Sequence, residues 1–179
     1  MKKWIGRIAL GRIMAAGIIS ISLTDCTSNN ATPGNSTSNV QSAIQAEIDR
    51  SLDATRRKDI NTFIDGFVPD FQIVTPEGSR ITLDTLRTNT LRDWSIIPAT
   101  RELTMRIDSL GPVRGDTAVA YTSQHWDRLM LERDGVTRDT VVTTQKHREV
   151  WRMTGGRWRR AEVKELGGTV EVNGKPFTQ

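Results

Sequence analysis

Apolar residues recur every three or four positions in three segments of the chain, which is the spacing of one face of a helix. The segments are 40–52, 60–67 and 83–94. Asp59 and Thr82 stand directly before the second and third segments, where a side-chain oxygen can accept a hydrogen bond from a free backbone N–H and begin a helix. The pattern therefore predicts three helices.

Apolar and polar residues alternate in five further segments, which is the period of a β-strand. Pro69 is expected to end the second helix before the first strand, and Gly111-Pro112 with 114–116 to form a turn. Asp134-Gly135 is a strong hairpin signal between two of the long strands. The order predicts an α+β fold, with N-terminal helices packed on a curved antiparallel β-sheet. The predicted strands cover 71–75, 103–107, 117–131, 140–153 and 157–166.

The start of the chain is typical of a signal peptide, predicted over 1–25, with basic residues in 1–12 and an apolar run over 13–23. The alternative is a transmembrane anchor over 4–23, although Arg7 and Arg12 interrupt it. Residues 26–39 are rich in Ser, Thr and Asn and are expected to form a flexible tether. The folded domain is predicted over 40–179, with its core over about 40–166.

Leu23-Thr24-Asp25-Cys26 resembles the lipobox of bacterial lipoproteins, in which the cysteine receives diacylglycerol. Asp25 departs from the small residue that is usual beside the cleavage site, so an ordinary signal peptide cut near Ser22 or Thr24 is the alternative. The resemblance implies an exported bacterial protein, held in the outer membrane through a lipidated Cys26 or free in the periplasm or medium. Cys26 is the only cysteine, so no internal disulfide is expected.

The net charge of +4 owes much to the leader, which holds four basic residues and one acid. The remaining residues hold 21 basic and 20 acidic side chains, close to neutral. The densest basic run, 157–160, alternates over both faces of a strand and has Glu149, Glu162 and Glu165 around it, which favours a solvated sheet face over nucleic-acid binding. The sequence has no metal-ligand motif, phosphate loop or nucleophile elbow, so no metal or cofactor is predicted.

Several stretches resemble the NTF2-like superfamily, in particular its SnoaL-like and DUF4440 group. They are Lys58-Asp59-Ile60 with Phe63 and Phe67, Pro69-Asp70-Phe71 before Pro76-Glu77-Gly78, and Glu149–Arg152 with Gly155–Arg159. The resemblance covers about 40–166 and implies a cone-shaped sheet with a pocket. The superfamily includes isomerases, dehydratases, hydrolases and members without known activity, and its members often dimerise through the outer sheet face.

One candidate catalytic group consists of His125 as a base, Asp127 orienting it and Tyr121 as an electrophile, because the three share one face of a strand. The same alternation also fits a half-exposed polar face. His147, beside Lys146 and Arg148, fits a surface histidine as well as a pocket one. If Arg133 opposes Val136 in the hairpin, the two histidines face opposite sides of the sheet, and a slip of one residue reverses this.

Bulky apolar side chains could line the pocket, although core packing explains them equally well. Ketosteroid isomerases of this superfamily carry a catalytic Asp after the first strand, where this chain has Thr75, and Glu77 would serve only if the turn were shifted. The pocket candidates are Trp94, Trp126, His147, Trp151, Phe63 and Phe67.

The pattern as a whole predicts an exported domain that binds a small apolar molecule or mediates association, without assured catalysis. The first alternative is an isomerase- or lyase-type enzyme that uses His125, Asp127 and Tyr121 in the cone. The second is a homodimeric protein-interaction module.

Overall fold

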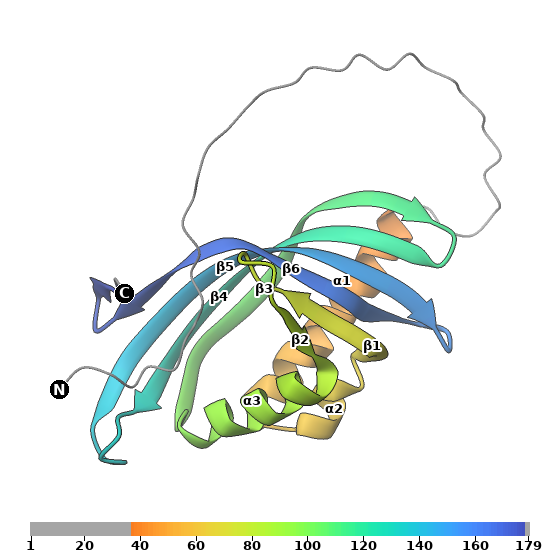
Figure 1. Cartoon of the computed structure of the whole chain (residues 1–179). Coiled ribbons are helices and arrows are strands. Elements are labelled where there is room, and N and C mark those ends of the chain that lie inside the picture. The colour runs from red at the N-terminus through yellow and green to blue at the C-terminus, as the bar shows by residue number, and fades with distance from the viewer. Residues whose placement is uncertain (1–36, 178–179) are drawn as a thin grey trace.

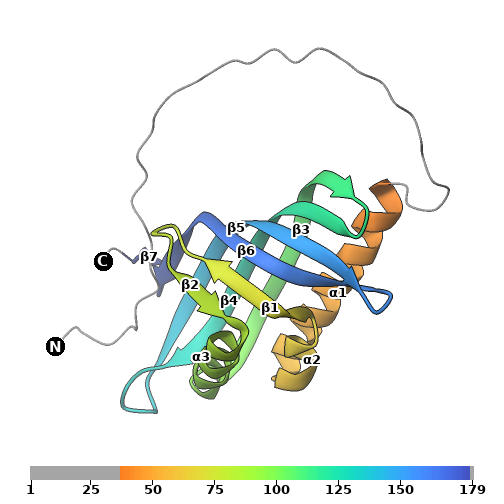
Figure 2. The ribbon, with the colours of Figure 1, turned by 45° about the vertical axis from the view of Figure 1, so that its right-hand side comes forward.

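Three helices and seven strands make up the part of the chain described by the computed structural model, residues 37–177. The strands form one curved sheet in the order β2-β1-β6-β5-β4-β3, with β7 paired to β6, and the helices pack against its concave side (Figures 1 and 2). Neighbouring strands are antiparallel except β1 and β6, so the sheet is mixed. The predicted α+β class is confirmed. The elements are α1 (Thr37–Arg57), α2 (Ile60–Ile64), β1 (Phe67–Val74), β2 (Arg80–Thr82), α3 (Leu83–Ser95), β3 (Ala99–Arg114), β4 (Thr117–Leu131), β5 (Arg138–Thr154), β6 (Arg157–Val172) and β7 (Lys175–Pro176).

Helix α1 buries the apolar stripe that its sequence predicts, with Val40, Ile44 and Ile48 against the sheet at Trp151 and Trp158. It begins at Thr37, so the last three residues of the predicted tether are helical. Small polar side chains suit a first helical turn, where backbone N–H groups lack partners inside the helix.

Lys58 ends α1 in the left-handed conformation, with φ of 56°, which a non-glycine residue rarely adopts. Its ammonium group donates to the carbonyl oxygens of Trp94 (2.8 Å) and Ile97 (2.7 Å), at the C-terminal end of α3. Asp59 then caps α2, accepting from the Thr62 N–H, as predicted. One residue thus joins the end of α1 to the end of α3.

The sequence prediction was wrong about Pro69, which lies inside β1 and does not end a helix. Helix α2 stops at Ile64, and the β1–β6 register shifts between Phe67 and Gln72, leaving Pro69 without a ladder partner. A proline is tolerated in a strand where no ladder bond is required of it.

Two long strands extend past their predicted ends. Strand β3 continues through Gly111-Pro112, where its pairing with β4 shifts register, and the turn follows at Gly115 with φ of 60°. Strand β6 continues through Gly167-Gly168 to Val172. A Cβ at Gly168 would lie 2.0 Å from the Thr144 carbonyl oxygen, so close strand approach requires glycine there.

The register of β4 and β5 places His125 and His147 on opposite faces of the sheet. His125 pairs with Thr144, and His147 pairs with Thr122. This is the register predicted for a two-residue turn in which Arg133 opposes Val136. The turn observed is longer than two residues, and it is closed by a hydrogen bond from the Glu132 N–H to the Thr137 carbonyl. Trp126 shares the concave face with His147.

The outer edge of the sheet, strand β3, is covered by side chains of α1. The Gln45 amide donates to the Met105 carbonyl (3.1 Å) and accepts from the Ile107 N–H (3.2 Å), as a neighbouring strand would. Arg56 donates to the Leu103 carbonyl. These bonds satisfy backbone groups that an edge strand otherwise leaves open.

The predicted signal peptide, Cys26 and most of the predicted tether lie outside the described residues, so the export, the lipidation and the tether stay predictions. None of the helices within residues 37–177 combines the length and the apolar character of a membrane span.

Gln45→Ala should lower the free energy of unfolding by about 1–3 kcal/mol, because it leaves one half-buried N–H and one C=O of β3 unpaired. Gln41→Ala, one turn earlier on α1 and exposed, is the matched control and should change it by less than about 0.5 kcal/mol. Urea denaturation measures both. Equal losses in the two variants would show that the amide does not hold the edge.

Candidate functional site

A cavity of about 260 Å³ lies between the concave face of the sheet and the helices. Side chains from all three helices and from strands β1, β3, β4, β5 and β6 line it, so the whole fold contributes to one site. Ligand pockets usually measure about 300–1,000 Å³. At about 260 Å³ the cavity lies just below this range, so it suits a molecule smaller than a typical drug-sized ligand.

The floor of the cavity is a buried ion pair between Glu149 of β5 and Arg160 of β6, which are 1% and 6% exposed. The Arg160 Nε lies 3.3 Å from both carboxylate oxygens of Glu149, and the Trp151 indole N–H donates to Glu149 at 2.9 Å. Arg160 also donates to the Ser51 hydroxyl of α1 and stacks 4.7 Å from the Trp151 ring centre. Each charge is thus compensated within the protein.

Arg160→Met should destabilise the fold by about 3–5 kcal/mol, because it leaves the Glu149 carboxylate buried without its counter-charge. Replacing both residues, Glu149→Met with Arg160→Met, should cost less than the single change. Arg152→Met, which removes a surface pair with Asp70, is the control and should cost at most about 1 kcal/mol. Chemical denaturation of the three proteins measures the order; a double variant less stable than the single one would contradict this account.

His147 lies two residues before Glu149 on the same strand, lines the cavity and is 7% exposed. Its Nδ1 is buried and has no hydrogen-bond partner among the described residues. Thr122, its partner on β4, likewise has a buried hydroxyl without a partner. Burial lowers the pKa of His147 and Arg160 lowers it further, while Glu149 opposes both, so the imidazole is neutral at neutral pH.

Glu165 of β6 is the Cα partner of His147, and it also lines the cavity. Burial raises the pKa of the Glu165 carboxyl, and the negative charge of Glu77 raises it further. Directly opposite residues have Cβ atoms about 4.5–5.5 Å apart. A neutral imidazole and a carboxyl that holds its proton more tightly than usual therefore stand side by side.

Aromatic rings form the opposite wall. Phe63 meets Phe67 and Trp94 edge-on, with ring centres 5.2 and 5.7 Å apart, and Phe67 meets Phe71 at 4.5 Å. Trp126 of β4 closes the wall, and its indole N–H donates to Thr100. Edge-on aromatic packing is a stable arrangement of neighbouring rings.

The structure brings five of the six predicted pocket residues together at this cavity. Trp151 does not line it; its side chain is fully buried in the core beneath, where its indole holds Glu149. The other five are Phe63, Phe67, Trp94, Trp126 and His147.

His125, Asp127 and Tyr121 do not reach the cavity, so their placement in the cone pocket is corrected. They lie on the other face of β4, where Tyr121 is 39% exposed. His125 Nε2 lies 3.8 Å from Glu102, and Asp127 lies 3.9 Å from Arg101. The alternation that placed the three on one face is present, but that face is the convex one.

Glu149, Arg160 and Glu165 are site residues that the sequence interpretation missed, because it assigned them to a solvated face. Only part of that face is solvated: Arg148 and Arg152 form surface pairs with Glu162 and Asp70. The sequence could have placed Glu149 at the cavity, because Glu149 has the same strand parity as His147 and Trp151, which were both predicted to line the pocket. Thr75, at the position compared with the catalytic Asp, is 8% exposed and accepts from the Ser79 N–H.

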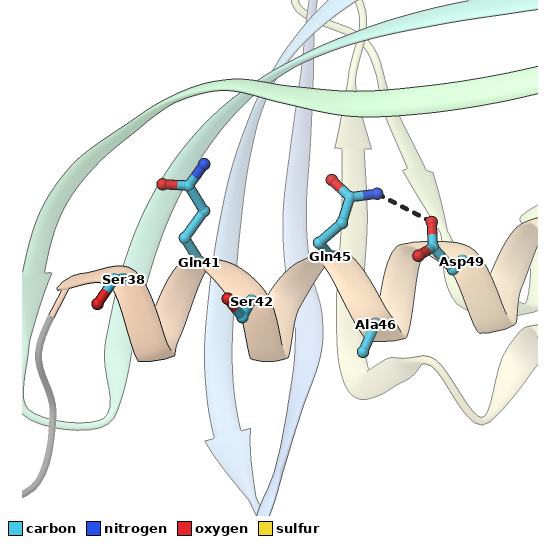
Figure 3. A pocket seen from close by; sticks show the side chains of 6 residues that line it. All are labelled: Ser38, Gln41, Ser42, Gln45, Ala46 and Asp49. Carbon is cyan, nitrogen blue, oxygen red and sulfur yellow. Dashed lines mark hydrogen bonds between the residues drawn. The ribbon is translucent and has the colours of Figure 1, made fainter.

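A second depression, of about 460 Å³, runs along α1 (Figure 3). All of its side chains come from that one helix, and Gln45 and Asp49 bond to each other. It is a surface groove with a single carboxylate. Among the described residues, no group of three or more His, Cys, Asp or Glu side chains is placed to hold a metal ion.

No protein-family model and no curated protein matches this sequence. Solved structures do match it. An NTF2-like superfamily protein from Salmonella enterica is 23% identical with a TM-score of 0.56, over 74% of this chain and 93% of that one. A protein named as a scytalone dehydratase from Novosphingobium aromaticivorans is 10% identical with a TM-score of 0.67, over 75% of this chain and 88% of that one. A ketosteroid isomerase-like protein from Erwinia carotovora is 19% identical with a TM-score of 0.51, over 71% of this chain and 96% of that one. The chain therefore has the NTF2-like fold, an α+β cone.

The pH dependence of stability should identify the buried histidine. The unfolded chain protonates His147 at about pH 6.5, whereas the folded state resists protonation until a lower pH, so stability should fall as pH drops below about 6.5. His147→Gln should reduce the slope of the free energy of unfolding against pH by up to about 1.4 kcal/mol per pH unit. Urea denaturation between about pH 7.5 and 5 measures it.

His125→Gln, on the convex face, is the matched control and should leave the slope unchanged. Glu165 acts in the opposite direction, since its raised pKa favours the folded state as pH falls, and it is present in all three proteins. A steeper slope in His147→Gln than in the unchanged protein would be incompatible with a neutral buried imidazole.

Proposed function

We propose that the protein binds a small, flat, uncharged molecule in its cone-shaped cavity. The observation that carries the proposal is the His147 imidazole, which is buried in the wall of a cavity with a ring nitrogen that has no partner among residues 37–177. Buried polar atoms in native proteins are nearly always hydrogen-bonded. A ligand with a hydroxyl or carbonyl group would supply the missing bond.

The electrostatics of the cavity support an uncharged ligand. The Glu149–Arg160 pair compensates itself, and burial favours the neutral forms of both His147 and Glu165. Among residues 37–177, the one positive side chain that lines the cavity is Arg160, which is paired with Glu149 and so is not free to receive an anion. The aromatic wall favours a ring system, since stacked and edge-on rings gain about 0.5–1.5 kcal/mol beyond burial of their area.

The names of two structures with the same fold, a scytalone dehydratase and a ketosteroid isomerase-like protein, are consistent with small-molecule sites on this fold. Association through the outer sheet face, the alternative, has less support. The exposed large apolar side chains of the described residues come from four different elements or turns, which are Leu91, Tyr121, Val136 and Leu166.

Isothermal titration calorimetry with 2-naphthol, a flat and uncharged phenol, tests the proposal. Thr90→Phe places a ring inside the cavity and should weaken binding by about tenfold or more, a loss of about 1.4 kcal/mol or more. Thr88→Phe makes the same change on the exposed side of α3 and should leave the affinity unchanged.

Two results would contradict the proposal. One is the absence of any heat of binding with the unchanged protein at millimolar 2-naphthol, and the other is equal weakening by the two Thr→Phe changes. The carboxylate 2-naphthoate, with the same rings, should bind more weakly than the phenol, because Asp93 lines the cavity and its one lining cation among residues 37–177, Arg160, is already paired with Glu149.

A further inference from the structure

We infer that Arg128 binds the carboxylate group of a small aliphatic acid, at a site on the concave face that lies outside the cavity. The inference is independent of the proposed function, because Arg128 does not line the cavity. It assigns a ligand to a buried cation that the fold leaves without a counter-ion.

Arg128 of β4 is buried as deeply as Arg160, since each residue is 6% exposed. Arg160 forms an ion pair with Glu149, whereas none of the carboxylates within residues 37–177 forms an ion pair with Arg128. Buried charged side chains in proteins are nearly always paired. Arg128 is therefore an exception in this interior, and its charge remains to be compensated.

Two carboxylates act on Arg128 from a distance, Asp93 of α3 and Asp127 of β4. Asp93 contacts Arg92 at 3.1 Å, and Asp127 lies on the convex face, 3.9 Å from Arg101. Burial lowers the pKa of Arg128 to about 10 and the two acids raise it only in part, so the guanidinium group is charged at neutral pH. The fold thus holds a cation that its own acids do not cover.

The guanidinium group is fixed in place with one edge unused. Its Nη1 donates to the Thr143 hydroxyl and, at 3.4 Å, to the Trp126 carbonyl, and its central carbon lies 4.2 Å from the Trp126 ring centre. The edge formed by Nε and Nη2 has no hydrogen-bond partner within residues 37–177. Nε is fully buried whereas Nη2 is not, so a ligand reaches this edge from the Nη2 side.

A carboxylate matches the free edge. Two parallel N–H groups of an arginine bind two oxygens of a carboxylate or a phosphate, and such charge-assisted bonds are stronger than neutral ones. A singly charged carboxylate is favoured over a doubly charged phosphate, because Arg128 is a single cation and the charges of Asp93 and Asp127 act on the same place.

The neighbours of Arg128 on the concave face are aliphatic. Val141 of β5 is its Cα partner, Val172 of β6 is the partner of Val141, and Met130 follows on the same face of β4. The β4–β5 hairpin extends past α3 in this region (Figures 1 and 2). An aliphatic chain attached to the carboxylate would lie along these side chains, which indicates a small aliphatic acid.

Isothermal titration calorimetry of the full chain with octanoate tests the site. Arg128→Met should weaken binding by about tenfold or more, because it removes two charge-assisted hydrogen bonds. Arg128→Lys keeps the charge but not the paired N–H edge, so it should also weaken binding. Arg133→Met, which is exposed in the turn of the same hairpin, is the matched control and should leave the affinity unchanged.

A comparison of probes on the unchanged protein gives a readout that does not depend on how any variant folds. 1-Octanol has the same chain without the charge and should bind at least about tenfold more weakly than octanoate. Inorganic phosphate, an oxyanion without a chain, should also bind more weakly. Equal affinities for octanoate and 1-octanol, or tighter binding of phosphate, would overturn the assignment of an aliphatic carboxylate.

Thr90→Phe distinguishes this site from the cavity, since it should weaken binding of 2-naphthol and leave the affinity for octanoate unchanged. Loss of octanoate binding in Thr90→Phe would place the acid in the cavity, and equal affinities of the unchanged protein and Arg128→Met would remove Arg128 from the site. Either result overturns the inference. Binding of octanoate without binding of 2-naphthol would overturn the proposed function and leave this inference standing.

Discussion

The buried pair of Glu149 and Arg160 is the contact on which the rest of the interior depends. Arg160 reaches the Ser51 hydroxyl of α1, the Met105 sulfur of β3 and the ring of Trp151, and Glu149 accepts the Trp151 indole N–H. Desolvating two charges costs several kcal/mol, which is recovered only when their geometry and remaining hydrogen bonds are good. Here each charged group has at least two partners, so the pair holds two strands, a helix and the core in one arrangement.

A polar floor also explains why the cone is hollow. Apolar side chains alone would close on one another, since interiors pack to the density of organic crystals. The ion pair fixes Glu149 of β5 at hydrogen-bond distance from Arg160 of β6. His147 and Glu165 lie beside this pair on the same two strands. On the helix side, the ammonium group of Lys58 binds the carbonyls of Trp94 and Ile97 and fixes the end of α3 that supplies Trp94 to the aromatic wall. Polar contacts therefore fix both the strands beneath the cavity and the helix end beside it.

The sequence predicted the fold correctly in segments where a single spacing of apolar residues dominated. The four-residue spacing of Val40, Ile44 and Ile48 predicted α1, and the caps Asp59 and Thr82 marked the next two helices. Prediction failed where tertiary pairing overrode a local signal. Pro69 reads as a helix end, yet it lies in an unpaired part of β1, and Gly111-Pro112 and Gly167-Gly168 read as turns or frayed ends, yet they bend strands that continue.

The site was less predictable than the fold, for a physical reason. The face of Glu149 follows from strand parity with Trp151, but parity cannot be carried from β5 to β6, because their register shifts between Val150 and Trp151 and again between Lys146 and His147. Arg160 lies opposite Trp151 in the register of the hairpin, and the shift between Val150 and Trp151 then places Val163 opposite Glu149 and Glu165 opposite His147. A bulge is a property of two strands together, and neither strand's alternation records it. The lining of this cavity thus depends on the irregularity between Val150 and Trp151, since a slip of one residue in β6 would turn Glu165 to the other face of the sheet, away from His147.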